Sequence, residues 1–405
     1  LSTLQNSSSF LYSDGQGNRY WYDTRPTLRK VMEDRAQQVA HEDAAYEVER
    51  RLKRLRRCEP FAGLHVCPAS SLDVPDEQRL RLVVLAPSTA HRASDDASRA
   101  VATAQAILDT RGTAPRQYKN MLVFVAADSA AMAGLERAAR AYLAWQSISD
   151  DREALNLDMA QARETEQNLA RADETLKARI QEAYSWLLAP AIDLASGSMD
   201  ITWDIDRIAG GGEDVPHKAA RKLIANEGVI TQWAPQLLTM ELDRVLWHDA
   251  DKHDIRVRQL WDYLCTYCYL PRLSGFSVLE DAIRQGSASR EYFGIASGFT
   301  DGRYLDLTLG QARARVNPTD LLVKRAVAAD QLEREEEERA EAERRRREQT
   351  AGDAGAGAAS GDGGSGGGHA TFDGLGGIGG SEARADSGEA GGGSIPATES
   401  LPVSF

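Results

Sequence analysis

Two near-continuous apolar runs place the strongest constraint on how this sequence can fold. They span residues 80–86 and 121–127, and neither alternates with polar residues as a half-exposed strand does. Helical spacing of apolar residues follows them over 97–108 and 130–145, and residues 63–67 form a further candidate strand. The repeated order of strand and helix predicts a small α/β unit whose neighbouring strands are parallel.

The N-terminal region predicts a hairpin followed by a basic helix. Aromatic runs flank residues 14–18, Asp-Gly-Gln-Gly-Asn, in which glycine and asparagine tolerate the positive φ of a tight turn. Residues 27–57 carry the apolar stripe of a helix, with a candidate break near His41 and basic residues in the last turns. Residues 151–189 contain the longest helical pattern, which predicts an arm of roughly 55 Å ending at Pro190.

Four more helices are predicted, over residues 217–226, 236–247, 257–269 and 277–285. The last of them ends at Gly286, and a second hairpin then turns through Asp301-Gly302. Helices followed by a two-stranded hairpin are the order of a winged helix. Because both hairpins have an Asp-Gly turn and a following Arg-Tyr pair, we interpret residues 1–24 as the wing of a truncated winged helix.

The C-terminal segment has a different composition. Residues 351–400 hold 18 of the 34 glycines, which predicts a flexible tail because so few large apolar side chains cannot offset the entropy of ordering. The predicted fold class is therefore mixed α/β and mainly α. The predicted segments are a wing (1–24), a basic amphipathic helix (25–57), a small α/β unit (58–150), a long helical arm (151–190), a winged-helix-like domain (191–312), a charged helix (313–349) and a disordered Gly-rich tail (350–405).

Charge and cysteine content limit the environment and the partners. The net charge is −13, of which the residues from Ala351 onward carry −6, so any nucleic-acid contact requires a local basic patch. Four cysteines are too few for a disulfide scaffold, and we find no signal peptide. Apolar runs stay below the ~18–20 residues that span a bilayer. These features predict a soluble, cytoplasmic protein without membrane contact.

Catalytic and metal-binding patterns are weak. The sequence has no Gly-x-x-x-x-Gly-Lys-[Ser/Thr] motif, and the histidines show no spacing typical of a catalytic site. Asp128 follows an apolar run, as a Walker-B aspartate does, but without a phosphate loop we expect it to cap the next helix. Cys265 and Cys268 form a C-x-x-C pair without a matching second pair, so we favour core packing over zinc. We therefore predict no catalytic, cofactor-binding or metal residue in this chain.

A cluster of cations near the end of the basic helix is the best candidate for phosphate contacts. Its members are Arg50, Arg51, Lys53, Arg54, Arg56 and Arg57. The alternative is a solvated helix face that pairs with Glu47 and Glu49 or with the charged helix. Arg19 and Arg303 stand beside tyrosines at the two hairpin turns, where each could contact the minor groove or backbone of DNA, although the tyrosines could equally face the core.

Several strings in these modules resemble a known family. They are the hairpin through Asn18-Arg-Tyr-Trp-Tyr-Asp-Thr-Arg-Pro-Thr27, Asn120-Met-Leu-Val-Phe-Val-Ala-Ala-Asp128, Tyr269-Leu-Pro-Arg-Leu273 and Asp301-Gly-Arg-Tyr304. Together they resemble the C-terminal region of domain-of-unknown-function 499 proteins, predicted AAA+ class ATPases often encoded beside DNA methyltransferases and helicases in anti-phage loci. The resemblance implies that ATP and Mg²⁺ are bound by an N-terminal phosphate-loop module that this sequence lacks, and that oligomers form through the parent ATPase.

Two functions follow as hypotheses. In the first, the chain is a non-catalytic C-terminal region that couples nucleotide-driven motion to double-stranded DNA or to a DNA-modification complex. In the second, it is a scaffold whose winged helices bind partner subunits, such as a methyltransferase or helicase, without contacting DNA. A nuclease-like α/β domain around Asp128 ranks below both because a second clustered acid and a lysine at suitable spacing are missing.

Overall fold

A computed structural model describes residues 11–13, 20–22, 26–93, 95, 98–210, 212–247 and 251–356. The described chain is mixed α/β, as the sequence predicts. Residues 1–340 form one compact unit, and a second unit, residues 341–405, contains the end of the last helix. The predicted disordered tail falls mostly on residues 357–405, which lie outside the described part of the chain.

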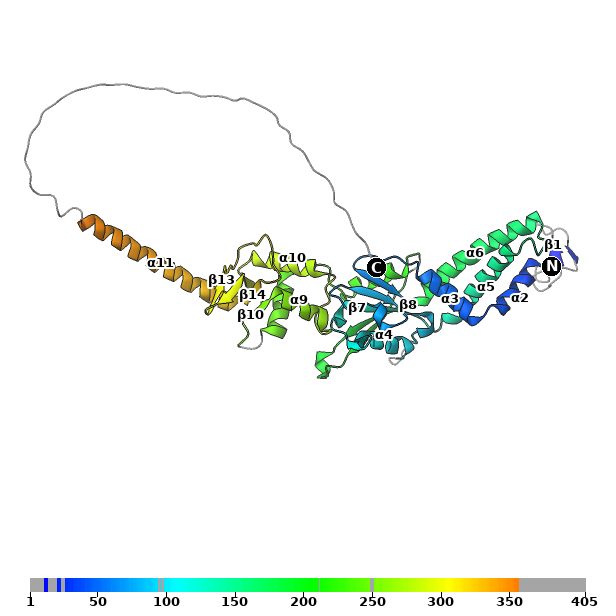
Figure 1. Cartoon of the computed structure of the whole chain (residues 1–405), viewed down its shortest axis with the longest axis horizontal. Helices are drawn as coiled ribbons and strands as arrows, with labels where there is room; N and C mark the ends of the chain where they lie inside the picture. The colour runs from blue at the N-terminus through cyan, green and yellow to red at the C-terminus, as the bar shows by residue number, and fades with distance from the viewer. Residues whose placement is uncertain are drawn as a thin grey trace, which may run out of the picture. The chain divides into compact units, whose positions relative to one another are not determined.

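A five-stranded sheet is the centre of the first unit (Figure 1). Its order is β3-β4-β7-β8-β9, with β3 (Gly63–Val66), β4 (Arg81–Val84), β7 (Leu122–Ala127), β8 (Tyr184–Ala191) and β9 (Thr202–Arg207). The first three strands are parallel, which confirms the predicted α/β unit. All residues of β4 and β7 are buried, in agreement with sequences that are apolar except for Arg81 at the start of β4.

The two strands that complete the sheet were not predicted. The helix expected over residues 151–189 ends at Ala183, so the prediction of a helical arm as far as Pro190 is wrong. Tyr184 and Leu187 continue the helical spacing, but they lie on β8, which runs antiparallel to β7. Pro190 is compatible with a strand because pairing with β7 ends at Leu188 and Pro190 pairs only with β9.

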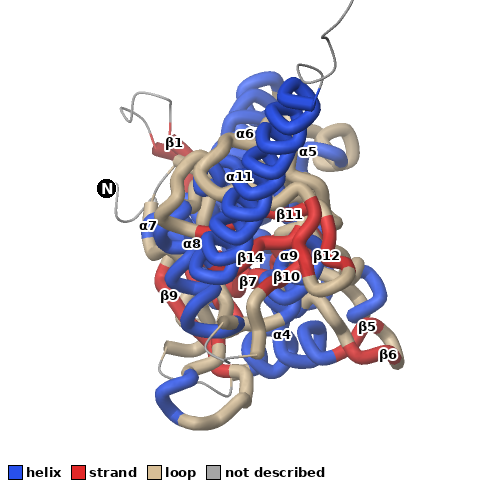
Figure 2. The backbone as a smooth tube through the Cα atoms, turned by 90° about the vertical axis from the view of Figure 1, so that its left-hand side faces the viewer, coloured by secondary structure: helices blue, strands red, loops and turns tan. Residues whose placement is uncertain are grey.

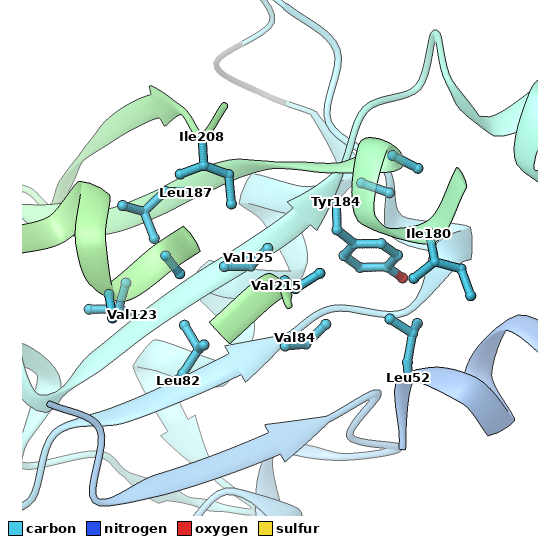
Figure 3. Packing of buried hydrophobic residues seen from close by; sticks show 14 of the residues in the cluster. Leu52, Leu82, Val84, Val123, Val125, Ile180, Tyr184, Leu187, Ile208 and Val215 are labelled. Atoms are coloured by element: carbon cyan, nitrogen blue, oxygen red, sulfur yellow. The ribbon is translucent and has the colours of Figure 1, made fainter. Parts of the chain in front are cut away.

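Helices cover both faces of the sheet. On one face α4 (Arg99–Asp109) packs on a core that includes Leu85 and Phe124. On the other face lie α3 (His41–Leu52), α7 (Val215–Ala225) and the end of α6 (Met159–Ala183), whose apolar side chains meet those of β4, β7 and β8. Figure 3 shows part of this core, in which Leu52, Ile180 and Val215 face the strands.

The long helix α6 packs against its predecessor rather than forming a free arm. The helix α5 (Met132–Asp150) is joined to α6 by a short connection, and α2 (Leu28–Gln38) lies beside α5 (Figure 1). Leu28, Trp145 and Ile148 form the apolar contact between them. The helix predicted over 27–57 is two helices, because α2 ends at Gln38 and α3 begins at His41, and the helical part stops at Leu52.

The remaining elements of the first unit have the order of a winged helix. They are α8 (Pro235–Glu241, continued by a π-turn over Leu242–Leu246), β10 (Asp254–Arg256), α9 (Val257–Thr266), α10 (Phe276–Ser287), β11 (Phe293–Ala296) and β14 (Leu321–Lys324). The three strands form an antiparallel sheet of order β10-β14-β11 (Figure 2). The predicted winged-helix-like order agrees with the observed architecture, but the predicted bounds 191–312 are wrong, because β9 joins the five-stranded sheet and β14 lies beyond residue 312.

The details of this region differ from the prediction. The Asp301-Gly302 turn joins β12 (Gly298–Thr300) to β13 (Arg303–Leu305), with φ of 50° and 77° as a tight hairpin turn requires. The preceding strand β11 pairs instead with β14, which lies inside the segment expected to be a charged helix. That helix, α11 (Arg325–Ala356), begins 12 residues later than residue 313 and continues past residue 350. Outside the winged helix, α7 packs into the α/β core.

Two short antiparallel hairpins lie outside the larger sheets. The strands β1 (Leu11–Ser13) and β2 (Tyr20–Tyr22) pair as the N-terminal hairpin predicts. Its turn, with Arg19, lies outside the described residues, so the predicted contact of Arg19 stays a prediction. The ribbon of β5 (Thr110–Arg111) and β6 (Ala114–Pro115) follows α4.

Candidate nucleic-acid interface

The basic cluster divides where α3 ends. Arg50 and Arg51 lie in the last turn of the helix, and both donate hydrogen bonds to Glu47, at 2.6 and 2.7 Å from their Nε atoms. Glu47 is only 3% exposed, so its two arginines neutralise a buried carboxylate. The predicted pairing with Glu47 is therefore observed for these two cations, but the solvated face that the prediction assumed is not, because Glu47 is buried.

Arg51 also connects three helices. Its guanidinium lies 2.5 Å from a carboxylate oxygen of Asp173 on α6 and 4.2 Å from the ring centroid of Tyr142 on α5. Burial raises the pKa of Glu47, but the hydrogen bonds from Arg50 and Arg51 outweigh that effect and hold it below its ordinary value. Arg51 is thus a structural cation.

The other cations follow the end of the helix, on an exposed turn and loop. Arg57 donates to Glu59 at 3.0 Å and to the carbonyl of Phe61 at 2.9 Å. Lys53, Arg54 and Arg56 are exposed and have no ion pair within the described part of the chain. These three are the cations of the cluster that remain available to a ligand.

One of them lines a groove with a second cation that was not predicted from the sequence. Arg54 lines a groove of about 260 Å³ together with Lys177 of α6 and Val215 at the start of α7. Lys177 is exposed, and it lies 123 residues from Arg54 in the sequence. Only the packing of α6 against α3 brings the two together, so no local pattern could have identified Lys177.

The wing residue Arg303 is already bound. Its guanidinium makes two hydrogen bonds, of 3.1 and 2.7 Å, to the carboxylate of Glu338 on α11. Those bonds raise the pKa of Arg303 and lower that of Glu338. Tyr304 faces inward, since it is 7% exposed and its hydroxyl donates to Asp254 at 2.8 Å. The core-facing alternative is therefore correct for this tyrosine.

The winged-helix surface that would face DNA is not basic. In a helix-turn-helix fold the second helix enters the major groove, and here that helix is α10. Its exposed positions are Ser277, Asp281, Arg284 and Gln285, and Arg284 is ion-paired with Asp281. The hairpin β12–β13 exposes Phe299 at 55% and Leu305 at 45%. This surface combines polar and apolar side chains, and its two arginines are paired to carboxylates.

A buried arginine joins the winged helix to the α/β sheet. Arg272 donates to the carbonyls of Asn120 (2.6 Å), Gly228 (2.9 Å) and Pro190 (2.8 Å), which come from three separate segments. Asn120 donates in turn to the carbonyls of Leu264 and Leu270. Burial lowers the pKa of Arg272, because its charge is removed from water. These hydrogen bonds, which we call the Arg272 junction, hold the winged helix against the α/β sheet.

The aspartate and the cysteine pair considered in the sequence analysis have structural roles. The cap expected at Asp128 is wrong, because α5 begins at Met132 and has no side-chain cap at Ala131. Asp128 instead accepts from the backbone N–H of Ala130 at 3.0 Å, in the turn before α5, and from Arg207 at 2.7 Å. Cys265 is fully buried in the winged-helix core, which confirms core packing, and burial raises the pKa of Cys268 to about 11. No cluster of three or more metal-ligating side chains occurs among the described residues.

Comparisons with known proteins found no matching family model, no matching curated protein and no matching solved structure. Within the described ranges, no helix combines the length and apolar character needed to cross a membrane.

Proposed function

We propose that the chain is a non-catalytic protein-interaction scaffold within a larger nucleotide-driven protein, and that its winged helix binds a partner subunit. ATP and Mg²⁺ are then bound by residues outside this sequence. The partner class that the family resemblance suggests is a DNA methyltransferase or helicase subunit.

The surface of the winged helix carries this proposal. Phe299 and Leu305 are large apolar side chains on an exposed hairpin, and aromatic anchors of this kind are enriched at protein interfaces. A duplex would instead require unpaired cations on α10 and the wing, where Asp281 and Glu338 occupy the arginines. The Arg272 junction supports a coupling role, because its hydrogen bonds join the winged helix directly to the sheet.

Contact with DNA through the loop after α3 is a second candidate. Lys53, Arg54 and Arg56 favour it, because they are exposed and without ion pairs among the described residues. This contact would use a different face from the partner surface, so the two functions can be tested separately.

Co-expression with a candidate methyltransferase or helicase subunit tests the scaffold. We expect the two proteins to co-elute on size exclusion, and we expect Phe299→Ser with Leu305→Ser to abolish co-elution while leaving the melting temperature unchanged. A matched pair of exposed apolar changes elsewhere, Tyr46→Ser with Met159→Ser, should retain it. The scaffold proposal fails if duplex DNA binds and if Arg284→Ala with Arg303→Ala removes that binding.

A further inference from the structure

We infer that the groove between the loop after α3, the end of α6 and the start of α7 is a binding site for a phosphate group. This inference uses residues remote from the winged-helix surface and stands independently of the scaffold proposal. The groove has a volume of about 260 Å³, which suits a phosphate with part of its ester substituent.

The groove combines an apolar floor with a cationic rim. Leu55, Ile180 and Val215 line it below, and Ile180 and Val215 are 6% and 0% exposed. Arg54 and Lys177 line it from two different elements, and neither has an ion pair among the residues that the structure describes. Arginine and lysine both donate charge-assisted hydrogen bonds to phosphate oxygens, so two unpaired cations at one concave site favour a dianion.

The start of α7 adds two backbone donors, the N–H groups of Val215 and His217. Pro216 has no N–H, and the N–H of Lys218 already bonds to the carbonyl of Asp214. This 11-residue helix begins at Val215, and the Asp214 side chain makes no capping hydrogen bond to its first turn. The first N–H groups of a helix lack intrahelical acceptors and carry the positive end of the helix dipole. Phosphates bind at helix starts for this reason, and here the helix start coincides with the two cations.

The buried ammonium of Lys218 lies beside the groove, where it offsets part of the charge of Glu213 and Asp214. Burial lowers the pKa of Lys218, and these two carboxylates oppose that effect. Lys218 is 3% exposed and donates to the carbonyl of Gln181, a groove residue, at 2.9 Å. No carboxylate forms a salt bridge with Lys218 in the described chain. The sequence predicts a helix over residues 217–226 but does not distinguish this lysine from the other residues of that helix.

Two carboxylates at the groove oppose an anion, and they differ in effect. Asp173 is neutralised by Arg51, whose own Nε atom is bound to Glu47. Asp214 contacts only the amide of Gln181, at 3.4 Å, among the hydrogen bonds described for its side chain. Asp214, which Lys218 offsets only in part, therefore faces two unpaired rim cations, so an anion is attracted overall. Removing the charge of Asp214 should strengthen the site.

The phosphate could belong to a nucleic-acid backbone or to a small free phosphate. Lys53 and Arg56 lie on the same loop as Arg54, and they would extend the contact along a polyanion. We therefore use three probes at equal ionic strength: a fluorescein-labelled 20-nucleotide single strand, the matching duplex, and pyrophosphate. Anisotropy follows the DNA probes, and calorimetry follows pyrophosphate.

The test compares two double variants of equal charge in the full chain. Arg54→Ala with Lys177→Ala should weaken binding by about tenfold per cation and lower the salt slope for DNA by about one unit per lost contact. The matched control is Arg137→Ala with Arg163→Ala, two exposed arginines outside the groove, and it should bind like the unmodified protein. Asp214→Asn should tighten binding, and Arg54→Lys with Lys177→Arg should retain it.

Each outcome either identifies the source of the phosphate or refutes the site. DNA binding that pyrophosphate displaces assigns the site to a nucleic-acid backbone, and pyrophosphate binding alone assigns it to a small phosphate. The site is refuted if no probe binds at low salt, or if the groove variant and its control lose affinity equally. Co-elution with a partner subunit is measured on the same variants, so loss of the scaffold function would be seen separately.

Discussion

Replacing Arg272 by methionine tests whether the buried junction stabilises the whole first unit. Methionine keeps a long unbranched side chain, but it removes the charge and every hydrogen-bond donor. The carbonyls of Asn120, Gly228 and Pro190 then lose their donor at a buried site. Each lost bond costs about 1–2 kcal/mol at such a position.

Two effects offset part of this cost. The desolvated guanidinium charge disappears, and methionine buries more apolar surface than arginine, which together return about 1–2 kcal/mol. The net loss should be about 2–4 kcal/mol in the free energy of unfolding. The stability of Arg272→Lys should lie between that of the unmodified protein and that of Arg272→Met. One ammonium keeps a donor but cannot reproduce the planar geometry that reaches three carbonyls.

Urea unfolding followed by tryptophan fluorescence measures the loss. The matched control is Arg284→Met, an exposed arginine of α10 whose ion pair with Asp281 should be worth less than about 0.5 kcal/mol. Limited proteolysis should also show earlier cleavage of the winged helix in Arg272→Met. A loss below about 1 kcal/mol, or an equal loss in Arg284→Met, would refute the reasoning about the junction.

Three further predictions follow from the packing and the pKa shifts. Glu47→Gln should cost about 2 kcal/mol at pH 7 and much less at pH 3, because the lowered pKa gives stability that is present above the ordinary carboxyl pKa of about 4 and is lost as the pH falls through the folded value. Urea midpoints at the two pH values check this, and a pH-independent difference would contradict it. Gly286→Ala should destabilise by about 1–3 kcal/mol, since the new Cβ would lie 2.6 Å from a ring atom of Phe293; a higher melting temperature would show that Phe293 yields. Cys265 and Cys268, whose thiol pKa values burial raises, should resist a disulfide reagent at pH 8 and react in urea. Fast labelling of both in the folded protein would contradict their burial.

The sequence predicted the parallel strands well because their signal is local. An apolar run such as residues 121–127 can only be buried on both faces, and the polar segments around it set its ends. The break near His41 was also visible, since the apolar stripe changes phase there. In contrast, β8 follows α6 without any breaker residue, and its apolar spacing fits both elements. Pairing with β7 and β9 decides that it is a strand.

Gly286 shows a similar limit of local interpretation. The sequence placed it as the residue that ends α10, where glycine often adopts a positive φ. The helix continues to Ser287, and Gly286 is instead the point of closest contact with Phe293 and Pro235. A glycine that terminates a helix and one that admits a neighbouring ring have the same sequence context, and only the packing of β11 separates them.

The basic cluster explains why the candidate site was only partly predictable. Eight consecutive residues hold six cations, five arginines and one lysine, yet α3 ends among them and gives them different partners. Arg50 and Arg51 face the buried Glu47 because they lie three and four residues after it on a helix, a relation that the sequence contains. Arg54 lies beyond the helix end, where spacing no longer fixes direction, and its neighbour Lys177 comes from a helix that packs there for apolar reasons. The charge of the cations at the proposed phosphate site is therefore evident from the sequence. Their position in the groove depends on the burial of Leu52 and Ile180 in the core. If that core were loosened, for example by Ile180→Ala, the groove should lose affinity for pyrophosphate even though every cation remained.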